Sequence, residues 1–259
     1  MTRYRATLSY DGTRYAGFQR QANGILTVQG CIEAALQTIL GQAVTVIGAG
    51  RTDAGVHALG QVIAFDADWQ HTDEALLRAI NANLPDDIAL QAVAQCAGFH
   101  PRFDARARRY HYDVIAAQVR QPTYNRHSWQ VLRRAPLDVD AMQTAADLLI
   151  GEHDFATFGK PPDASSNNTV RKVFTSHWQT TELAYSRLHA YTIEATAFLQ
   201  HMVRRIVAML VMVGTGAQSV QGFEQAFRDA QLQGGTPLAP PQGLYLTSVR
   251  YNNLQHKSN

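Results

Sequence analysis

The sequence predicts an α+β fold made of two similar halves. Short apolar runs of strand length recur along the 259 residues, and they alternate with segments that carry apolar residues at helical spacing. Both halves show these elements in the order β-α-β-β-α-β, although the sequence itself does not repeat. That order is typical of the ferredoxin-like unit. Two such units can join edge to edge, which predicts one extended antiparallel sheet with helices on one face and a central cleft on the other.

The elements of the first half, residues 1–100, follow from spacing and from end signals. Thr27 and Thr72 are predicted helix N-caps, because each precedes apolar residues three and four positions apart. Gly41 and Pro85 are expected to end these two helices. Four apolar runs predict strands, at 4–10, 44–47, 62–65 and 88–93.

The second half, residues 101–259, is predicted in the same way. We expect strands at 109–115, 170–179, 184–196 and 244–251, and helices at 139–150, 198–213 and from Ser219. The segment Gly159–Thr169 is rich in proline, serine and asparagine, which predicts a loop. Such a loop could cover a cleft or could be a plain surface turn.

Arginine dominates the basic residues. The formal net charge is only +2, and three of the 23 basic residues are lysines. Arginine forms planar, bidentate contacts to phosphate and carboxylate. Two groups of arginines contain few acids, which favours a basic face for a polyanion, although ordinary solvated arginines would give the same pattern. The groups are Arg3, Arg5, Arg14 and Arg20, and Arg102, Arg106, Arg108, Arg109, Arg120, Arg126, Arg133 and Arg134.

Several common classes of protein are disfavoured. Cys31 and Cys96 lack the spacing of a disulfide framework or a zinc site. The N-terminus lacks the apolar core of a signal peptide, and the apolar run 206–213 is far shorter than the ~18 residues of a membrane span. These features predict a soluble cytoplasmic protein with no membrane association. The sequence contains no Walker A loop, HExxH or GxSxG motif, which disfavours a metal, a nucleotide cofactor and a serine hydrolase.

The stretch GAGRTDAGVHALGQV, residues 48–62, is the strongest candidate for a site. It begins like a dinucleotide-binding loop, but Asp53 stands where the third glycine should be and a strand follows. Arg51 can reach Asp53 across a tight loop and keep its carboxylate ionised. Such a carboxylate can act as nucleophile, base or ligand. An aspartate in a turn can equally be a local capping residue.

Two residues of the second half are candidate partners of this loop. The predicted helix FLQHMVRRIVAMLVMV is apolar around most of its circumference and carries no acid. Arg204 on this helix therefore either faces the carboxylate of Asp53 or extends into water. Tyr110 follows a run of arginines. It either packs against a neighbouring strand or stacks on a nucleic-acid base.

Taken together, these stretches resemble the tRNA pseudouridine synthase A (TruA) family. The resembling pieces are YDGTRYAGFQRQ, TVQGCIEAAL, GAGRTDAGVHALGQV, FHPRFDARARRYHY, GEHDFATF, FLQHMVRRIV and APPQGLYL. The resemblance implies the pseudouridine synthase fold and an isomerase that converts uridine to pseudouridine at positions 38, 39 and 40 of the tRNA anticodon stem-loop. It implies Asp53 as the catalytic nucleophile, and Tyr110, Arg51 and Arg204 as substrate-binding residues. It further implies a homodimer that binds the tRNA anticodon arm without metal or cofactor.

Two positions depart from the family pattern, and two other functions stay open. Phe18 stands where tryptophan is frequent, and Gly159 stands where arginine is common, so details of RNA docking differ. One alternative is an RNA-binding module that keeps the fold without catalysis. The other is a related tRNA pseudouridine synthase with a different site specificity. A binding module has no use for the carboxylate of Asp53, which therefore discriminates the first alternative.

Overall fold

Ten strands and five α-helices make up the described part of the chain, and the sheet pairing is mostly antiparallel. This architecture confirms the predicted α+β class. The computed structural model describes residues 1–22, 24–161, 167–232 and 234–252, so residues 162–166 of the predicted loop Gly159–Thr169 lie outside it. None of the helices within these ranges is both long and apolar enough to cross a bilayer.

The chain divides into two units. Unit 1 comprises Met1–Arg108 and Tyr245–Asn259, and unit 2 comprises Arg109–Leu244. The final strand thus belongs with the N-terminal residues. The functional division into halves at residue 100, and the central cleft, stay predictions.

Unit 1 contains a sheet with the strand order β4-β1-β3-β10. The central pairs are antiparallel, whereas β10 runs parallel to β3 and places Tyr245 opposite His57. A short strand, β2, pairs with β3. The strands are β1 (Thr2–Tyr10), β2 (Ile47–Gly48), β3 (His57–Ala67), β4 (Ile88–Gln95) and β10 (Leu244–Tyr251).

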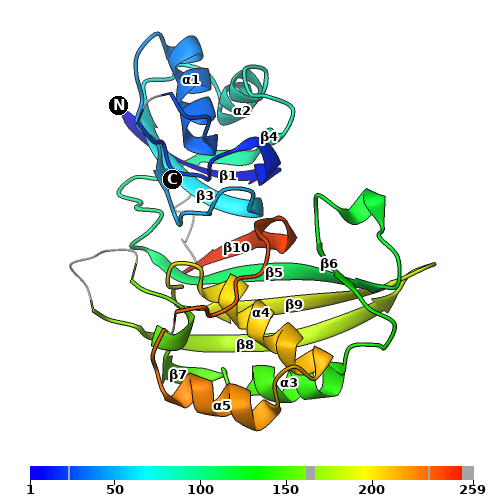
Figure 1. Cartoon of the computed structure of the whole chain (residues 1–259). Coiled ribbons are helices and arrows are strands. Elements are labelled where there is room, and N and C mark those ends of the chain that lie inside the picture. The colour runs from blue at the N-terminus through cyan, green and yellow to red at the C-terminus, as the bar shows by residue number, and fades with distance from the viewer. Residues whose placement is uncertain (23, 162–166, 233, 253–259) are drawn as a thin grey trace. The chain divides into compact units, whose positions relative to one another are not determined.

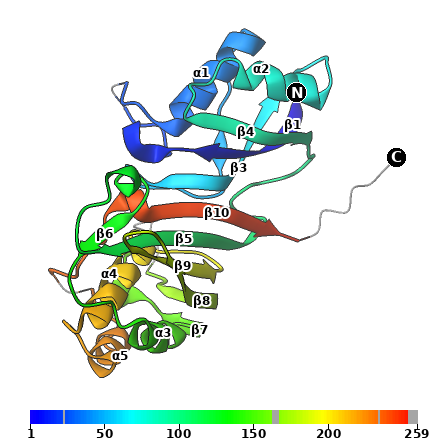
Figure 2. The same ribbon diagram turned by 90° about the vertical axis from the view of Figure 1, so that its right-hand side faces the viewer.

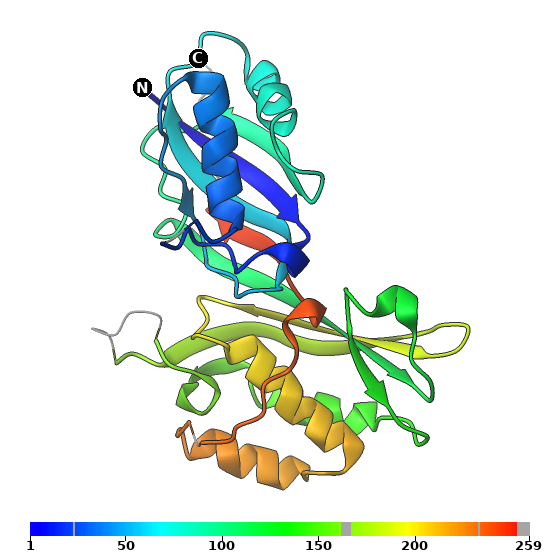
Figure 3. The ribbon, with the colours of Figure 1, turned by 45° about the horizontal axis from the view of Figure 1, so that its top comes forward.

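Two helices cover one face of this sheet (Figures 2 and 3). They are α1 (Val28–Leu40) and α2 (Asp73–Asn81). The Thr27 side chain accepts a hydrogen bond from Gly30 N, and Gly41 ends α1 with φ 68°, so both predicted ends are confirmed. Thr72 caps α2 as predicted. Tyr4 of β1 is fully buried and stacks on Phe65 of β3 with ring centroids 5.6 Å apart.

The strand predicted at 44–47 is wrong for most of its length. Only Ile47 belongs to β2. Val46 N donates to Glu33 Oε1 at 3.0 Å, and Val46 O accepts from Gln29 Nε2 at 3.0 Å. The backbone at Val46 is therefore satisfied by two side chains of α1 rather than by a neighbouring strand.

Unit 2, which includes β5 from Arg109 onward, contains strands in the order β5-β9-β8-β7, with β6 parallel to β5. The predicted strands at 109–115, 170–179 and 184–196 are confirmed, whereas β6 and β7 are not anticipated because four residues give too little alternation. The strands are β5 (Ala105–Ala117), β6 (Trp129–Leu132), β7 (Gly151–Asp154), β8 (Val170–Glu182) and β9 (Arg187–Ala195).

Three α-helices complete unit 2. They are α3 (Val139–Asp147), α4 (Met202–Thr215) and α5 (Val220–Arg228), and α4 crosses β9 and β8 (Figure 1). Ser219 caps α5 through its side chain. Helix α4 begins four residues later than predicted, because Gln200 N donates to Lys160 O at 2.9 Å and His201 has φ 63°. Four short 3-10 helices lie at Gly12–Arg14, Pro122–Tyr124, Ala156–Phe158 and Pro241–Gly243.

The buried Glu33 provides a test of how α1 holds the chain that leads into β2. Its carboxylate also accepts from Arg20 Nη1 at 2.9 Å. We expect Glu33→Ala to lower the free energy of unfolding by about 1–3 kcal/mol, since Val46 N loses its buried acceptor. Urea denaturation measures this change. The matched control is Glu182→Ala, which removes an exposed pair with Arg187 and should cost less than about 1 kcal/mol. Equal losses in both variants would contradict the assigned role of Glu33.

Candidate active site

Asp53 lies in the tight loop that connects β2 to β3 in unit 1. Val56 N donates to Asp53 O at 3.2 Å, which closes a turn immediately after the aspartate. Gly55 within this turn has φ 76°, a left-handed conformation that favours glycine. The Asp53 side chain is half-buried, whereas Arg51 is exposed. The loop thus presents a carboxylate at a partly sheltered position.

The segment that follows β1 supports this loop from one side. Phe18 N donates to Thr52 O at 3.1 Å, and Gly55 N donates to Tyr15 O at 3.3 Å. The hydroxyl groups of Tyr10 and Thr52 lie 2.8 Å apart and form a buried hydrogen bond. The residue before Asp53 and the second residue after it are therefore both attached to the 10–18 segment. The motifs YDGTRYAGFQRQ and RTDAGVHA form one local structure.

Two glycines allow this close approach. A Cβ atom on Gly12 would lie 2.0 Å from Val56 O, and one on Gly17 would lie 2.8 Å from Thr52 O. Gly17 also has φ 101°. Any larger residue at either position would force the two segments apart.

Asp87 anchors the 10–18 segment through three of its residues. Its carboxylate accepts from Arg14 Nε at 2.7 Å and from the Tyr15 hydroxyl at 2.5 Å. Asp11 N donates to Asp87 O at 2.9 Å. Burial acts to raise the pKa of Asp87, but the hydrogen bonds from Arg14 and Tyr15 outweigh it and hold the pKa below its ordinary value.

The N-terminal part of the loop is held by two side chains from elsewhere in unit 1. Gln61 is fully buried and donates from Nε2 to Gly50 O at 2.9 Å. Arg108 donates from Nη2 to Ala49 O at 3.0 Å. Both carbonyl groups precede Arg51, so the backbone is fixed before and after the Arg51–Asp53 stretch. Sequence reasoning missed these roles, because Arg108 appeared only as one of a basic cluster.

His57, at the start of β3, completes the support. It is almost fully buried, and its Nδ1 accepts from Gly12 N at 3.1 Å. Its ring stacks on Tyr245 of β10 with centroids 4.8 Å apart. The histidine of the GVHA motif therefore has a packing role within unit 1.

The two candidates in the second half, Tyr110 and Arg204, both lie in unit 2. Tyr110 is buried in β5 and meets Phe198 edge to face, with ring centroids 5.0 Å apart. Arg204 is half-buried on α4 and donates from Nε to Ala239 O at 2.7 Å. The structure thus brings Arg51 and Asp53 onto one loop of unit 1. The convergence of Tyr110 and Arg204 on Asp53 stays a prediction.

Tyr112 and Arg204 hold the same backbone segment of unit 2. The Tyr112 hydroxyl donates to Pro240 O at 2.7 Å, next to the carbonyl of Ala239 that Arg204 binds. Burial raises the pKa of Tyr112 above its ordinary value. The motif APPQGLYL therefore starts on a segment fixed by two polar side chains.

Many of the clustered arginines are engaged within the protein. Their partners are carboxylates or backbone carbonyl groups, which reduces the number available for a polyanion. The ion pairs are Arg3–Asp66, Arg14–Asp87, Arg20–Glu33 and Arg109–Glu194, and Arg133 donates to Gly214 O.

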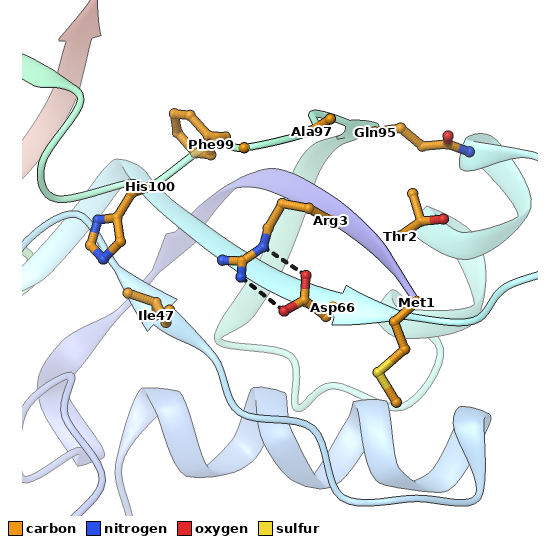
Figure 4. A pocket seen from close by; sticks show the side chains of 10 residues that line it. Met1, Thr2, Arg3, Ile47, Asp66, Gln95, Ala97, Phe99 and His100 are labelled. Atoms are coloured by element: carbon orange, nitrogen blue, oxygen red, sulfur yellow. Dashed lines mark hydrogen bonds and ion pairs between the residues drawn. The ribbon is translucent and has the colours of Figure 1, made fainter.

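A pocket of about 700 Å³ lies on unit 1 but does not include Asp53. The ion pair between Arg3 and Asp66 crosses it, and Phe99 and His100 form part of its wall (Figure 4). Both nitrogens of the Arg3 fork are bound to the carboxylate at 2.7 and 2.8 Å. The charge in this pocket is therefore already paired.

The sequence matches the family model described as tRNA pseudouridine synthase over residues 6–104 and 145–252. The chain belongs to the tRNA pseudouridine synthase family. Pseudouridine synthases are isomerases, so the predicted family and enzyme class are confirmed. Asp53, Arg51 and Arg204 lie in the matched segments of the family model, whereas Tyr110 lies between them.

Relatives in this family match nearly the whole chain. The tRNA pseudouridine synthase A of Neisseria gonorrhoeae is 43% identical over 252 residues, which cover 96% of this chain and 92% of that protein. The protein of the same name from Chloroflexus aurantiacus is 44% identical, with coverages of 94% and 87%. That of Myxococcus xanthus is 39% identical, with coverages of 98% and 93%.

The close approach at Gly12 makes the support of the loop testable. We expect Gly12→Ala to lower the free energy of unfolding by about 1–3 kcal/mol, because the new methyl group overlaps Val56 O. Chemical denaturation measures the change. Gly234→Ala is the matched control, since a Cβ there meets nothing within 4 Å and should change stability by less than about 0.5 kcal/mol. Wild-type stability of Gly12→Ala would show that the two segments are not tightly joined.

Proposed function

We propose that the protein isomerises uridine to pseudouridine at positions 38, 39 and 40 in the anticodon stem-loop of tRNA, with Asp53 as the nucleophile. The observation that carries the proposal is the Asp53 loop, whose backbone is braced on both sides while the carboxylate stays partly accessible. A fixed backbone keeps a reactive group oriented without cost at the moment of reaction. The relatives are named tRNA pseudouridine synthase A, and the resemblance to that family motivates the three tRNA positions.

The reaction rearranges one nucleotide. The N1–C1′ bond of uridine breaks, the uracil turns, and C5 bonds to C1′. C5 then loses its proton, and N1 gains one. The change is redox-neutral, so we propose that no cofactor takes part. A carboxylate can assist by attacking C1′, by removing a proton from C2′, or by adding to C6 of the uracil.

The other predicted residues have roles in binding the substrate. We propose that Tyr110 contacts the uracil and that Arg51 binds either Asp53 or the RNA. The target base must leave its stack before it can react, and a side chain such as Arg51 can occupy the space that it vacates. We further propose a cytoplasmic homodimer that binds the anticodon arm.

Replacement of Asp53 tests the nucleophile. Asp53→Asn keeps the size of the side chain but removes its charge, and we expect pseudouridine formation to fall by at least about 10⁴-fold. Affinity for tRNA should change by less than about threefold. Single-turnover assays on an unmodified tRNA transcript measure the first quantity, and filter binding measures the second. Asp140→Asn, an exposed position on α3, is the control. An active Asp53→Asn protein would refute the assignment of the nucleophile, whereas wild-type protein that binds tRNA without forming pseudouridine would support the binding-module alternative.

Replacement of Arg204 tests whether a residue of the second half contributes to the rate of the reaction. We expect Arg204→Met to reduce the single-turnover rate at saturating tRNA by about 10- to 100-fold, the worth of one hydrogen bond to a charged group. The affinity for tRNA should change much less. Arg228→Met, which removes an exposed arginine paired with Glu224, should behave like wild type. A pure loss of affinity in Arg204→Met would instead assign this arginine to the binding of phosphates.

A further inference from the structure

The segment that follows β4 exposes an aromatic ring to solvent. Phe103 is 75% exposed, and its neighbours Arg102 and Asp104 are also exposed. A single exposed apolar side chain is by itself common on protein surfaces, so the case for a role of Phe103 depends on how the ring is held and on its neighbours. The roles proposed above for Asp53, Arg51, Tyr110 and Arg204 do not account for the exposure of Phe103.

Phe103 is held in place by the turn that carries it. Its ring stacks on His100, with centroids 4.2 Å apart and planes at 26°. The Nδ1 atom of His100 accepts from the backbone nitrogens of Arg102 and Phe103, both at 3.2 Å. Asp104 Oδ2 accepts from His100 N at 2.8 Å, and Asp104 N donates to His100 O at 3.1 Å. The exposed ring is therefore pre-organised.

The base of the turn is anchored in unit 1. Phe99 is buried and meets Tyr251 edge to face at 5.1 Å, and the Tyr251 hydroxyl donates to Pro101 O at 2.8 Å. The guanidinium of Arg5 lies 4.6 Å from the Tyr251 ring centroid. This packing fixes the base of the turn, so a ligand can bind at its tip without a change in the backbone.

One guanidinium joins this turn to the Asp53 loop. Arg108 Nη2 donates to Arg102 O at 2.8 Å and to Ala49 O at 3.0 Å. The residue before Phe103 and the start of the Asp53 loop are thus bridged by a single nitrogen atom. The backbone of the turn that carries Phe103 therefore lies next to the start of the loop that holds the proposed nucleophile.

We propose that Phe103, backed by His100, stacks on an unpaired base of the tRNA close to the target uridine. This inference rests on the proposed function. Stacking on aromatic side chains next to cations is how proteins hold unpaired bases, and the Arg102 guanidinium lies 6.0 Å from the Phe103 ring centroid. A contact of Phe103 with another protein molecule is the alternative outcome of the experiments below.

Four variants at Phe103 and a control separate stacking from other contacts. We expect Phe103→Ala and Phe103→Leu to weaken tRNA binding by about 5- to 100-fold, the range for loss of one stacked base. Phe103→Tyr and Phe103→Trp should bind within about twofold of wild type. Tyr185→Ala removes another exposed aromatic side chain, at 84% exposure in the β8–β9 turn, and should have no effect. If Phe103→Leu binds tRNA as tightly as the wild-type protein, the contact needs only an apolar side chain and not an aromatic ring. That result would overturn the proposal.

Salt dependence and oligomeric state provide two further measurements. Loss of a stacked base releases no counterions, so the slope of log Kd against log salt should be the same in Phe103→Ala and wild type. Sedimentation should give equal oligomeric states. A changed oligomeric state with unchanged tRNA binding would identify Phe103 as a protein contact and overturn the proposal.

The affinity for tRNA and the formation of pseudouridine are measured separately. The stacking role of Phe103 and the proposed function can therefore be refuted independently. Absence of pseudouridine at every tRNA position with wild-type protein would refute the proposed function. The stacking role of Phe103 would still be decided by the binding of unmodified transcript. At saturating tRNA, Phe103→Ala should isomerise within about twofold of the wild-type rate. A lost rate with unchanged affinity would contradict a binding role.

Discussion

The hydrogen bond from Phe18 N to Thr52 O is the contact on which the geometry of the Asp53 loop depends. It joins two segments that approach so closely that Gly12 and Gly17 leave no room for a side chain. Most other features of the site follow from this junction. The pairing of Arg14 and Tyr15 with Asp87 holds one segment, and Gln61 and Arg108 hold the other. These contacts fix the backbone of the loop on both sides of Asp53.

The fold was largely predictable because most of its signals are local. The N-caps of α1, α2 and α5 and the alternation in β1, β8 and β9 depend on residues next to one another in the chain. The failures have non-local causes. The chain at Val46 is not a strand, because its partners are the side chains of Gln29 and Glu33. The delayed start of α4 depends on Lys160, 40 residues earlier than Gln200.

The candidate site was predictable in its chemistry but not in its support. Asp53 was conspicuous because it lies among glycines between two apolar runs, and the family resemblance gave it a role. Arg108 and Gln61 act on backbone carbonyl groups, and such contacts leave no periodic signal. Charge counting has the same weakness. Arginines that cluster in the sequence, such as Arg3 and Arg109, are paired with carboxylates far away in the chain, so their density overstates the positive surface.

The last strand has a consequence for how the protein is made. β10 supplies Tyr245, which stacks on His57 at the end of the Asp53 loop. In the sequence, Tyr245 is separated from the first 108 residues of unit 1 by all of unit 2. Domains commonly fold during synthesis from the N-terminus onward. Here the first 108 residues are synthesised well before the final strand of unit 1, because all of unit 2 lies between them in the sequence. A nascent chain therefore has the Asp53 loop without the support of Tyr245 until all of unit 2 has been synthesised.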